Sequence, residues 1–230
     1  MATFAALLVL TSAGVVAWLY LYTADLPSVS QIDRFDPPSE SLVNISRCDG
    51  SSTTITAFPR RQLGLFLPNA VLVAEGKPDP NKPFLAVARD LLRSEGKYGH
   101  YSWQIARDLV CSGHPLQRTV QELRVANAIE RTFSQEQILT IYLNTIYVGS
   151  GMYGADAASE HYFRRPPSDL SLAQAATIAA LIRNPNYYSP MLHPDNALAR
   201  RNAVIDRMFA IGSISADYAQ EAKESKLVTR

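Results

Sequence analysis

The chain has 230 residues, which corresponds to one domain of ordinary size with a short additional segment. Charged residues make up 19% of the chain and hydrophobic residues 47%, a composition typical of a folded protein rather than a disordered one. The 22 basic side chains nearly balance the 21 acidic ones, which argues against the basic surface that nucleic-acid binding needs. Cys48 and Cys111 fit no zinc-ligand pattern, and their spacing neither requires nor excludes a single disulfide.

Residues 1–24 contain no charged side chain. The apolar run TFAALLVLTSAGVVAWLYLY, at about 1.5 Å per residue, is long enough to cross roughly 30 Å of hydrocarbon. Trp18, Tyr20 and Tyr22 lie together at its end, as aromatic residues do at the lipid headgroups. A cleaved signal peptide is the alternative, but no basic residue precedes the run and no clear small-residue cleavage site follows it. We predict a membrane-spanning anchor over residues 1–24, whose orientation the flanking charges leave open.

The next segment, residues 25–66, is rich in Ser, Pro and Asp. Two short stretches, 41–45 and 53–58, alternate apolar and polar residues, and Asp49-Gly50 between them is a turn sequence. We therefore predict an extended connector that contains a small hairpin.

Helical patterns begin at Leu67 and continue to the end of the chain, and no strand alternation competes with them. Two capping boxes, Ser134 with Gln137 and Ser171 with Gln174, predict helix starts. The helix that follows Ser171 is expected to stop near Arg183, because the residue before Pro185 disfavours the helical conformation. Asp195 and Ser215 are the caps expected for two later helices, of which the first runs through Ile211, and a further helix is expected over residues 115–131. The faces expected to be buried are Ala199, Ala203, Ile205 and Met208 on the first of these two helices, and Val120, Leu123, Ala126 and Ile129 on helix 115–131.

Three features go beyond secondary structure. Glu75 ends an apolar segment at the start of a Gly/Pro-rich loop, where a carboxylate is a candidate acid or base, although most glutamates are plain surface residues. Glu122 follows Arg118 by four residues, and an ordinary helix-face ion pair is the simplest explanation of that spacing. Glycines 149, 151 and 154 allow a tight loop or a close approach to a ligand, and packing is the commoner reason for such a pattern. The four histidines show no metal-ligand spacing.

Several longer blocks of sequence resemble a known family. YLNTIYVGSGMYG, AASEHYF, LSLAQAATIAALIRNPNYYSP and ARRNAVIDRM are similar to the peptidoglycan glycosyltransferase domain (glycosyltransferase family 51) of penicillin-binding proteins and monofunctional transglycosylases. The resemblance covers most of the chain. It implies a mainly α, lysozyme-like domain with a small jaw subdomain that dips into the membrane. With the anchor, it divides the chain into residues 1–24, 25–66 and 67–230.

The resemblance also implies a function. The expected substrate is lipid-linked disaccharide-pentapeptide, polymerised into glycan on the outer side of the bacterial inner membrane, with other cell-wall synthesis proteins as possible partners. The reaction needs a base for the attacking hydroxyl and cations for the departing pyrophosphate. No cofactor is implied beyond a divalent cation that accompanies the substrate. By the resemblance, Glu75 is the base and Glu122 assists the leaving group. The substrate-binding residues that it implies are Arg107, Arg118, Gln104, Asn144 and Tyr153.

Departures from the family pattern support a second hypothesis. The family usually has Asp after its first glutamate, where this chain has Gly76, and the donor-side motif is reduced to YGHYSWQ, in which Gln104 is the match. Thr119 replaces a lysine. These features favour a catalytically degenerate relative that binds precursor, glycan or a cell-wall synthesis partner. A third hypothesis, a lysozyme-like hydrolase, agrees less well with the anchor and the C-terminal blocks.

Overall fold

The computed structural model describes residues 29–46, 52–75, 101–111 and 113–227, with residues 14 and 26 besides. The rest of the predicted anchor and the hairpin turn at Asp49-Gly50 lie outside the described residues. Within the described ranges, no helix combines the length and the hydropathy needed to cross a bilayer.

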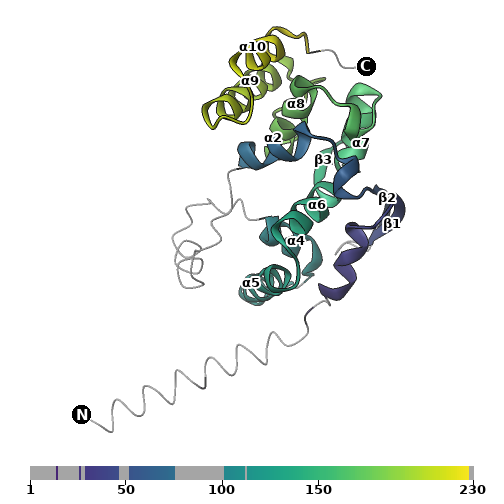
Figure 1. The fold of residues 1–230 in the computed structure, drawn as a ribbon. Helices are drawn as coiled ribbons and strands as arrows, with labels where there is room; N and C mark the ends of the chain where they lie inside the picture. The colour runs from purple at the N-terminus through teal and green to yellow at the C-terminus, as the bar shows by residue number, and fades with distance from the viewer. Residues whose placement is uncertain are drawn as a thin grey trace, which may run out of the picture.

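The fold is mainly helical, which confirms the mainly α part of the prediction (Figure 1). The helices are α2 (Phe66–Glu75), α4 (Tyr101–Leu109), α5 (Pro115–Thr132), α6 (Gln135–Thr145), α7 (Ala155–Phe163), α8 (Leu172–Arg183), α9 (Pro194–Ala210) and α10 (Ala216–Glu224). Short 3-10 helices are η1 (Val29–Phe35), η2 (Arg60–Gln62) and η3 (Pro167–Asp169). The strands are β1 (Ser41–Ser46), β2 (Ser52–Ala57), β3 (Tyr147–Gly149) and β4 (Met152–Tyr153).

Helix α8 forms the centre of the core. Residues 175–182 are all buried, and four of these eight are alanines, so neighbouring helices can approach the α8 backbone closely. A helix that is apolar on every side needs partners on every side. Helices α2, α9 and α7 and strand β3 supply them, and α2 is thereby held against both α8 and α9.

The local start and stop signals in the sequence are confirmed. Ser134 and Ser171 each accept a hydrogen bond from the backbone N–H three residues later. The side-chain oxygen of the glutamine at that position accepts a hydrogen bond from the backbone N–H of the serine. Helix α8 ends at Arg183, as Pro185 predicted. The Ser215 hydroxyl accepts from the Tyr218 N–H at 3.3 Å and caps α10.

The start of α9 and part of two buried faces differ from the prediction, while Ile205, Met208 and Ile129 are buried as predicted. Helix α9 begins at Pro194 with His193 as its cap rather than at Asp195, because the fixed φ of proline suits the first helical position. Ala199 and Ala203 are exposed. The residues buried on α9 are Ala197, Arg201, Val204, Ile205 and Met208, and among the α5 side chains that the structure describes they are Gln121, Glu122, Val125 and Ile129. Each buried face includes charged or polar side chains, which an apolar pattern assigns to solvent.

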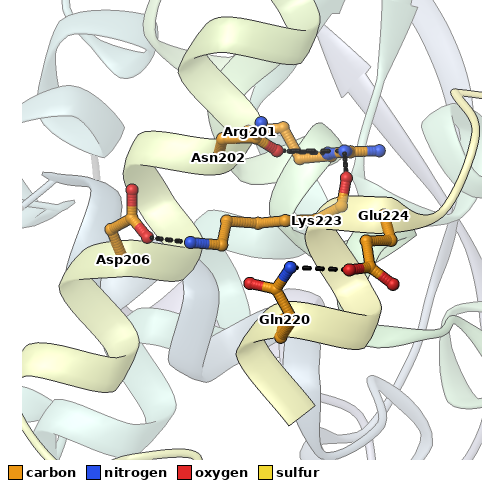
Figure 2. A network of polar contacts seen from close by, with 6 residues as sticks. All are labelled: Arg201, Asn202, Asp206, Gln220, Lys223 and Glu224. Carbon is orange, nitrogen blue, oxygen red and sulfur yellow. Dashed lines mark hydrogen bonds and ion pairs between the residues drawn. The ribbon is translucent and has the colours of Figure 1, made fainter. Parts of the chain in front are cut away.

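Arg201 lies on the buried face of α9 because its guanidinium group is bound by polar partners (Figure 2). Its Nη1 and Nη2 atoms donate to the carbonyls of Ser225 and Lys223 at 2.9 and 2.8 Å, at the C-terminal end of α10. These carbonyls have no partner within the helix and carry negative partial charge, so they stabilise a cation. Asn202 Oδ1 accepts two further bonds from the same guanidinium. Arg201 therefore fixes α10 onto α9.

The predicted hairpin forms as antiparallel β1 and β2, with Ser41 opposite Ala57 and Ser46 opposite Ser52. The segment expected to be an extended connector is also packed: Ile32 and Phe35 of η1 belong to the hydrophobic core. A second pair of strands, β3 and β4, was not predicted. Strands of three and two residues are too short to show alternation, and the glycine loop between them hides the pattern.

The glycine loop is shaped by backbone conformations with positive φ. Gly149, Gly151 and Gly154 have φ values of 93°, 76° and 89°. A Cβ at Gly154 would lie 2.7 Å from the carbonyl oxygen of Asn144, whereas a Cβ at Gly151 would meet nothing within 4 Å. The loop glycines serve turn formation at one position and a close backbone contact at another.

We predict that Gly154→Ala destabilises the protein more than Gly151→Ala. Both changes place a side chain at positive φ, at a cost of about 1 to 2 kcal/mol. Only Gly154→Ala adds a collision with the α6 backbone, worth about 1 to 3 kcal/mol more. Denaturant unfolding of the two variants measures the difference. Equal free energies of unfolding would contradict the close contact.

Candidate functional site

Glu75 is the last residue of α2, so the apolar helix delivers its carboxylate to the edge of the core. The residues before it include the buried side chains of Ala70, Val71 and Ala74, while Glu75 itself is half-buried. Its Oε1 atom is buried and has no hydrogen-bond partner among the described residues. One lone-pair-bearing oxygen of this acid is therefore uncommitted.

Aromatic rings and one amide surround Glu75 on the α4 and α6 side. Tyr101 of α4 and Tyr142 of α6 pack with ring centroids 4.7 Å apart, and the Tyr101 hydroxyl lies 3.5 Å from the carbonyl of Val71 on α2. Burial raises the pKa of both phenols above 10, and the neighbouring Glu75 charge adds to the effect. Both hydroxyls therefore stay protonated at neutral pH. Gln104 of α4 stands beside Glu75 and Tyr142.

Two arginines, from α8 and α9, also act on Glu75. Arg183 ends α8, and Arg200 lies on α9, where its Nη2 atom donates to the carbonyl of Ala74 at 3.3 Å. Burial raises the pKa of Glu75 above its ordinary 4.5, and this exceeds the lowering by Arg183, Arg200 and hydrogen bonding to Gln104. Sequence reasoning missed both arginines, because no local spacing relates them to Glu75.

A second charged group lies where α4 meets α5. Arg118 Nε donates to Glu122 Oε1 at 2.8 Å, so the predicted ion pair forms. The Glu122 side chain is 8% exposed and that of Arg118 is 45% exposed. Arg118 Nη2 also contacts the carbonyl of Arg107 at 3.4 Å, and Arg107 is exposed. The structure thus brings together three of the predicted residues, Glu122, Arg118 and Arg107.

Helix α4 connects the two groups. Gln104 stands beside Glu75, and Arg107, whose carbonyl contacts Arg118, follows three residues later on the same helix. The Glu75 group and the Glu122 group therefore both contact α4.

Asn144 has a structural role in place of the expected substrate contact. It is 1% exposed. Its Nδ2 donates to the carbonyls of Phe35 and Phe58, both at 2.8 Å, and its Oδ1 accepts from the Phe58 N–H at 3.1 Å. The amide joins α6 to η1 and to the end of β2, and it is fully occupied there. Tyr153, the remaining predicted contact, is half-buried in β4 with its ring centroid 5.0 Å from that of Tyr147.

Metal-ligating side chains do not gather in the described part of the chain: no group of three or more His, Cys, Asp or Glu there could hold an ion. Cys111 is disulfide-bonded. The other cysteine of the chain, Cys48, lies outside the described residues.

Asn144→Ala is expected to lower the free energy of unfolding by about 2 to 4 kcal/mol, because it leaves three buried backbone groups without partners. Asn44→Ala is the matched control, since its exposed amide accepts one bond from Thr54 on the paired strand. Its cost should stay below about 1 kcal/mol. Chemical denaturation tests both variants, and similar losses would contradict the structural role of Asn144.

The raised pKa of Glu75 predicts how stability depends on pH. The folded state binds the proton of the Glu75 carboxyl group more tightly than the unfolded chain does, so this protonation stabilises the fold. Its contribution to the free energy of unfolding is fully present below pH 4.5 and is lost as the pH rises through the pKa of the folded state. Thermal unfolding of Glu75→Gln should therefore show a growing advantage over wild type as the pH rises from 4.5 toward neutrality. Glu136→Gln, at a side chain 73% exposed, is the control. An advantage that shrinks with rising pH would refute the raised pKa.

Comparison with known proteins identifies the family. The family described as transglycosylase matches residues 87–209, which is more than half of the chain and includes Glu122 but begins after Glu75. Penicillin-binding protein 1A of Rickettsia felis is 33% identical over 98% of this chain and 31% of its own length. Penicillin-binding protein 1A of Aquifex aeolicus is 41% identical over 55% of this chain and 18% of its own length.

A crystal structure of penicillin-binding protein 1A from Haemophilus influenzae aligns over 84% of this chain and 22% of its own, with 21% identity and a TM-score of 0.43, a similarity too distant to add to the assignment. The chain spans about a third of the length of the Rickettsia felis relative. From the family match, the chain belongs to the transglycosylase family.

Proposed function

We propose that this chain is a peptidoglycan glycosyltransferase that polymerises lipid-linked disaccharide-pentapeptide, with Glu75 as the general base. The observation that carries the proposal is the environment of Glu75, a half-buried carboxylate with a raised pKa, one uncommitted oxygen and two arginines nearby. Family membership supports the reaction class.

The chemistry requires a proton acceptor beside the attacking hydroxyl. The bond that forms joins the hydroxyl oxygen of one unit to the anomeric carbon of the other, and the bond that breaks releases the lipid pyrophosphate. Glu75 receives the hydroxyl proton on its carboxylate. A carboxylate whose pKa is raised toward the working pH is a stronger base than an ordinary glutamate and is still ionised often enough to act.

Charge on the departing pyrophosphate needs cations. Arg107 and Arg118 are the proposed phosphate contacts, because both guanidinium groups reach the surface beside α4. Glu122 orients Arg118 through the ion pair at 2.8 Å. Arginine can donate two parallel bonds to a phosphate group, which suits it to this role. Gln104 and Tyr153 complete the proposed substrate contacts.

The proposed location is the bacterial plasma membrane, with residues 1–24 as a single-pass anchor, a membrane-dipping jaw and the domain on the outer side. The disulfide at Cys111 supports this side, because structural disulfides persist in oxidising compartments and are rare in the cytosol. The proposed partners are the lipid-linked precursor and other cell-wall synthesis proteins, and a divalent cation could accompany the substrate.

One observation favours the second candidate, a non-catalytic relative that binds precursor or a partner protein. The Glu122 carboxylate is almost closed off from solvent and is bound by Arg118, so in this conformation it offers little to a ligand. Only the first candidate turns the precursor over.

We predict that the full chain, in detergent or in vesicles with lipid-linked precursor, yields glycan strands and that Glu75→Gln yields none, because the hydroxyl proton then has no acceptor. Glu136→Gln, an exposed glutamate on α6, should retain the wild-type rate. Gel separation of labelled strands measures the product.

Three outcomes would count against the proposal. Equal polymer from Glu75→Gln would remove Glu75 from its assigned role. Precursor binding without turnover by the wild-type chain would favour the degenerate relative. Release of soluble muropeptides from wall sacculi would instead indicate a hydrolase.

A further inference from the structure

The end of α2 is an unfavourable place for an ionised glutamate. The last carbonyls of a helix have no partner within it, and they give the C-terminal end a negative partial charge. Glu75 is the final residue of α2, so its carboxylate lies at that negative end. Its partial burial opposes ionisation as well. A base in this position needs a compensating cation from elsewhere in the fold.

Arg200 is placed to supply that cation. Its Nη2 atom donates to the carbonyl of Ala74 at 3.3 Å, across a sequence separation of 126 residues. The guanidinium carbon lies 5.9 Å from the ring centroid of Tyr188, in the loop between α8 and α9. Its Nε is buried and makes no hydrogen bond to any described residue. One side chain thus binds the end of α2, contacts an aromatic ring and keeps a donor uncommitted.

Other groups face Glu75 from three further helices. Tyr101 and Gln104 come from α4 and Tyr142 from α6, and none of these carries a charge at neutral pH. Arg183, at the end of α8, is the other cation, and its charge lowers the pKa of Glu75 more than that of Arg200 does, but it is exposed and forms no hydrogen bond with α2 in the described part of the chain. Of the described residues that act on Glu75, Arg200 alone is both charged and bonded to the helix that carries it.

We propose that Arg200 is a positioning residue for the reaction, which fixes the end of α2 and keeps the Glu75 carboxylate ionised so that it can accept the substrate proton. This inference rests on the proposed function of Glu75 as the base. Arg200 acts through Glu75 and through the Ala74 carbonyl, and it takes no part in bond making.

The pH dependence of polymerisation tests the role of Arg200. Arg200→Gln should move the acid limb of the kcat/KM profile to higher pH, so that its loss of rate is largest at low pH and narrows as the pH rises. Arg200→Lys should restore most of the wild-type profile, because it returns the charge. Arg207→Gln, an exposed arginine two turns later on α9, removes the same charge away from the site and should leave the profile unchanged.

A loss of rate by Arg200→Gln that is equal at every pH would overturn the proposal, and so would a failure of Arg200→Lys to restore the profile. Either result would indicate that Arg200 serves stability alone.

A second measurement does not depend on turnover. Arg200→Gln is introduced into the full chain in two backgrounds, one that keeps Glu75 and one that carries Glu75→Gln. The thermal unfolding midpoint is measured with and without Arg200→Gln in each background. If Arg200 supports the ionised acid, Arg200→Gln lowers the midpoint more at neutral pH than below pH 4.5 in the background that keeps Glu75. In the Glu75→Gln background, Arg200→Gln lowers the midpoint by the same amount at both pH values. Equal shifts in both backgrounds at both pH values would refute the coupling, whether or not the chain polymerises glycan.

Discussion

The central constraint of the structure lies at the end of α2, where an apolar helix places the Glu75 carboxylate in an environment that disfavours its negative charge. Packing of α2 against α8 and α9 sets the position, and the half-burial of Glu75 follows from it. Burial has the larger effect on the pKa of Glu75, while the nearby guanidinium groups limit the rise. The same packing brings Arg200 of α9 to the end of α2. The core that buries Glu75 therefore also supplies a positive charge that limits the rise of its pKa.

The two predicted acids are treated differently by the fold. Glu122 is bound directly by Arg118 at 2.8 Å, while Glu75 forms no ion pair with a described residue and keeps one oxygen without a partner. A paired carboxylate holds an arginine in place, whereas an unpaired one with a raised pKa can take up a proton. Helix α4 lies between the two groups and contributes to each of them. This division agrees with one acid as the base and the other as part of a cation site.

The sequence predicted what local chemistry determines. Capping boxes at Ser134 and Ser171, the stop before Pro185 and the Arg118–Glu122 pair each involve residues a few positions apart, and all appear in the structure. Buried faces were harder to predict, because Arg201 and Glu122 lie inside with polar partners that only the fold supplies. The arginines beside Glu75 could not be found, since their partner lies more than 100 positions away. Asn144 matched a family position, yet backbone contacts formed across the fold occupy it.

The titration of Glu75 itself tests most directly whether this carboxylate is suited to act as the base. Carbon-13 NMR of the side-chain carboxyl group, assigned by comparison with Glu75→Gln, reports its protonation in the full chain across the pH range. We predict a midpoint above the ordinary glutamate value of 4.5. A midpoint at or below 4.5 would show a carboxylate stabilised by its arginines as an ordinary ion pair, and the site would lose its distinguishing property.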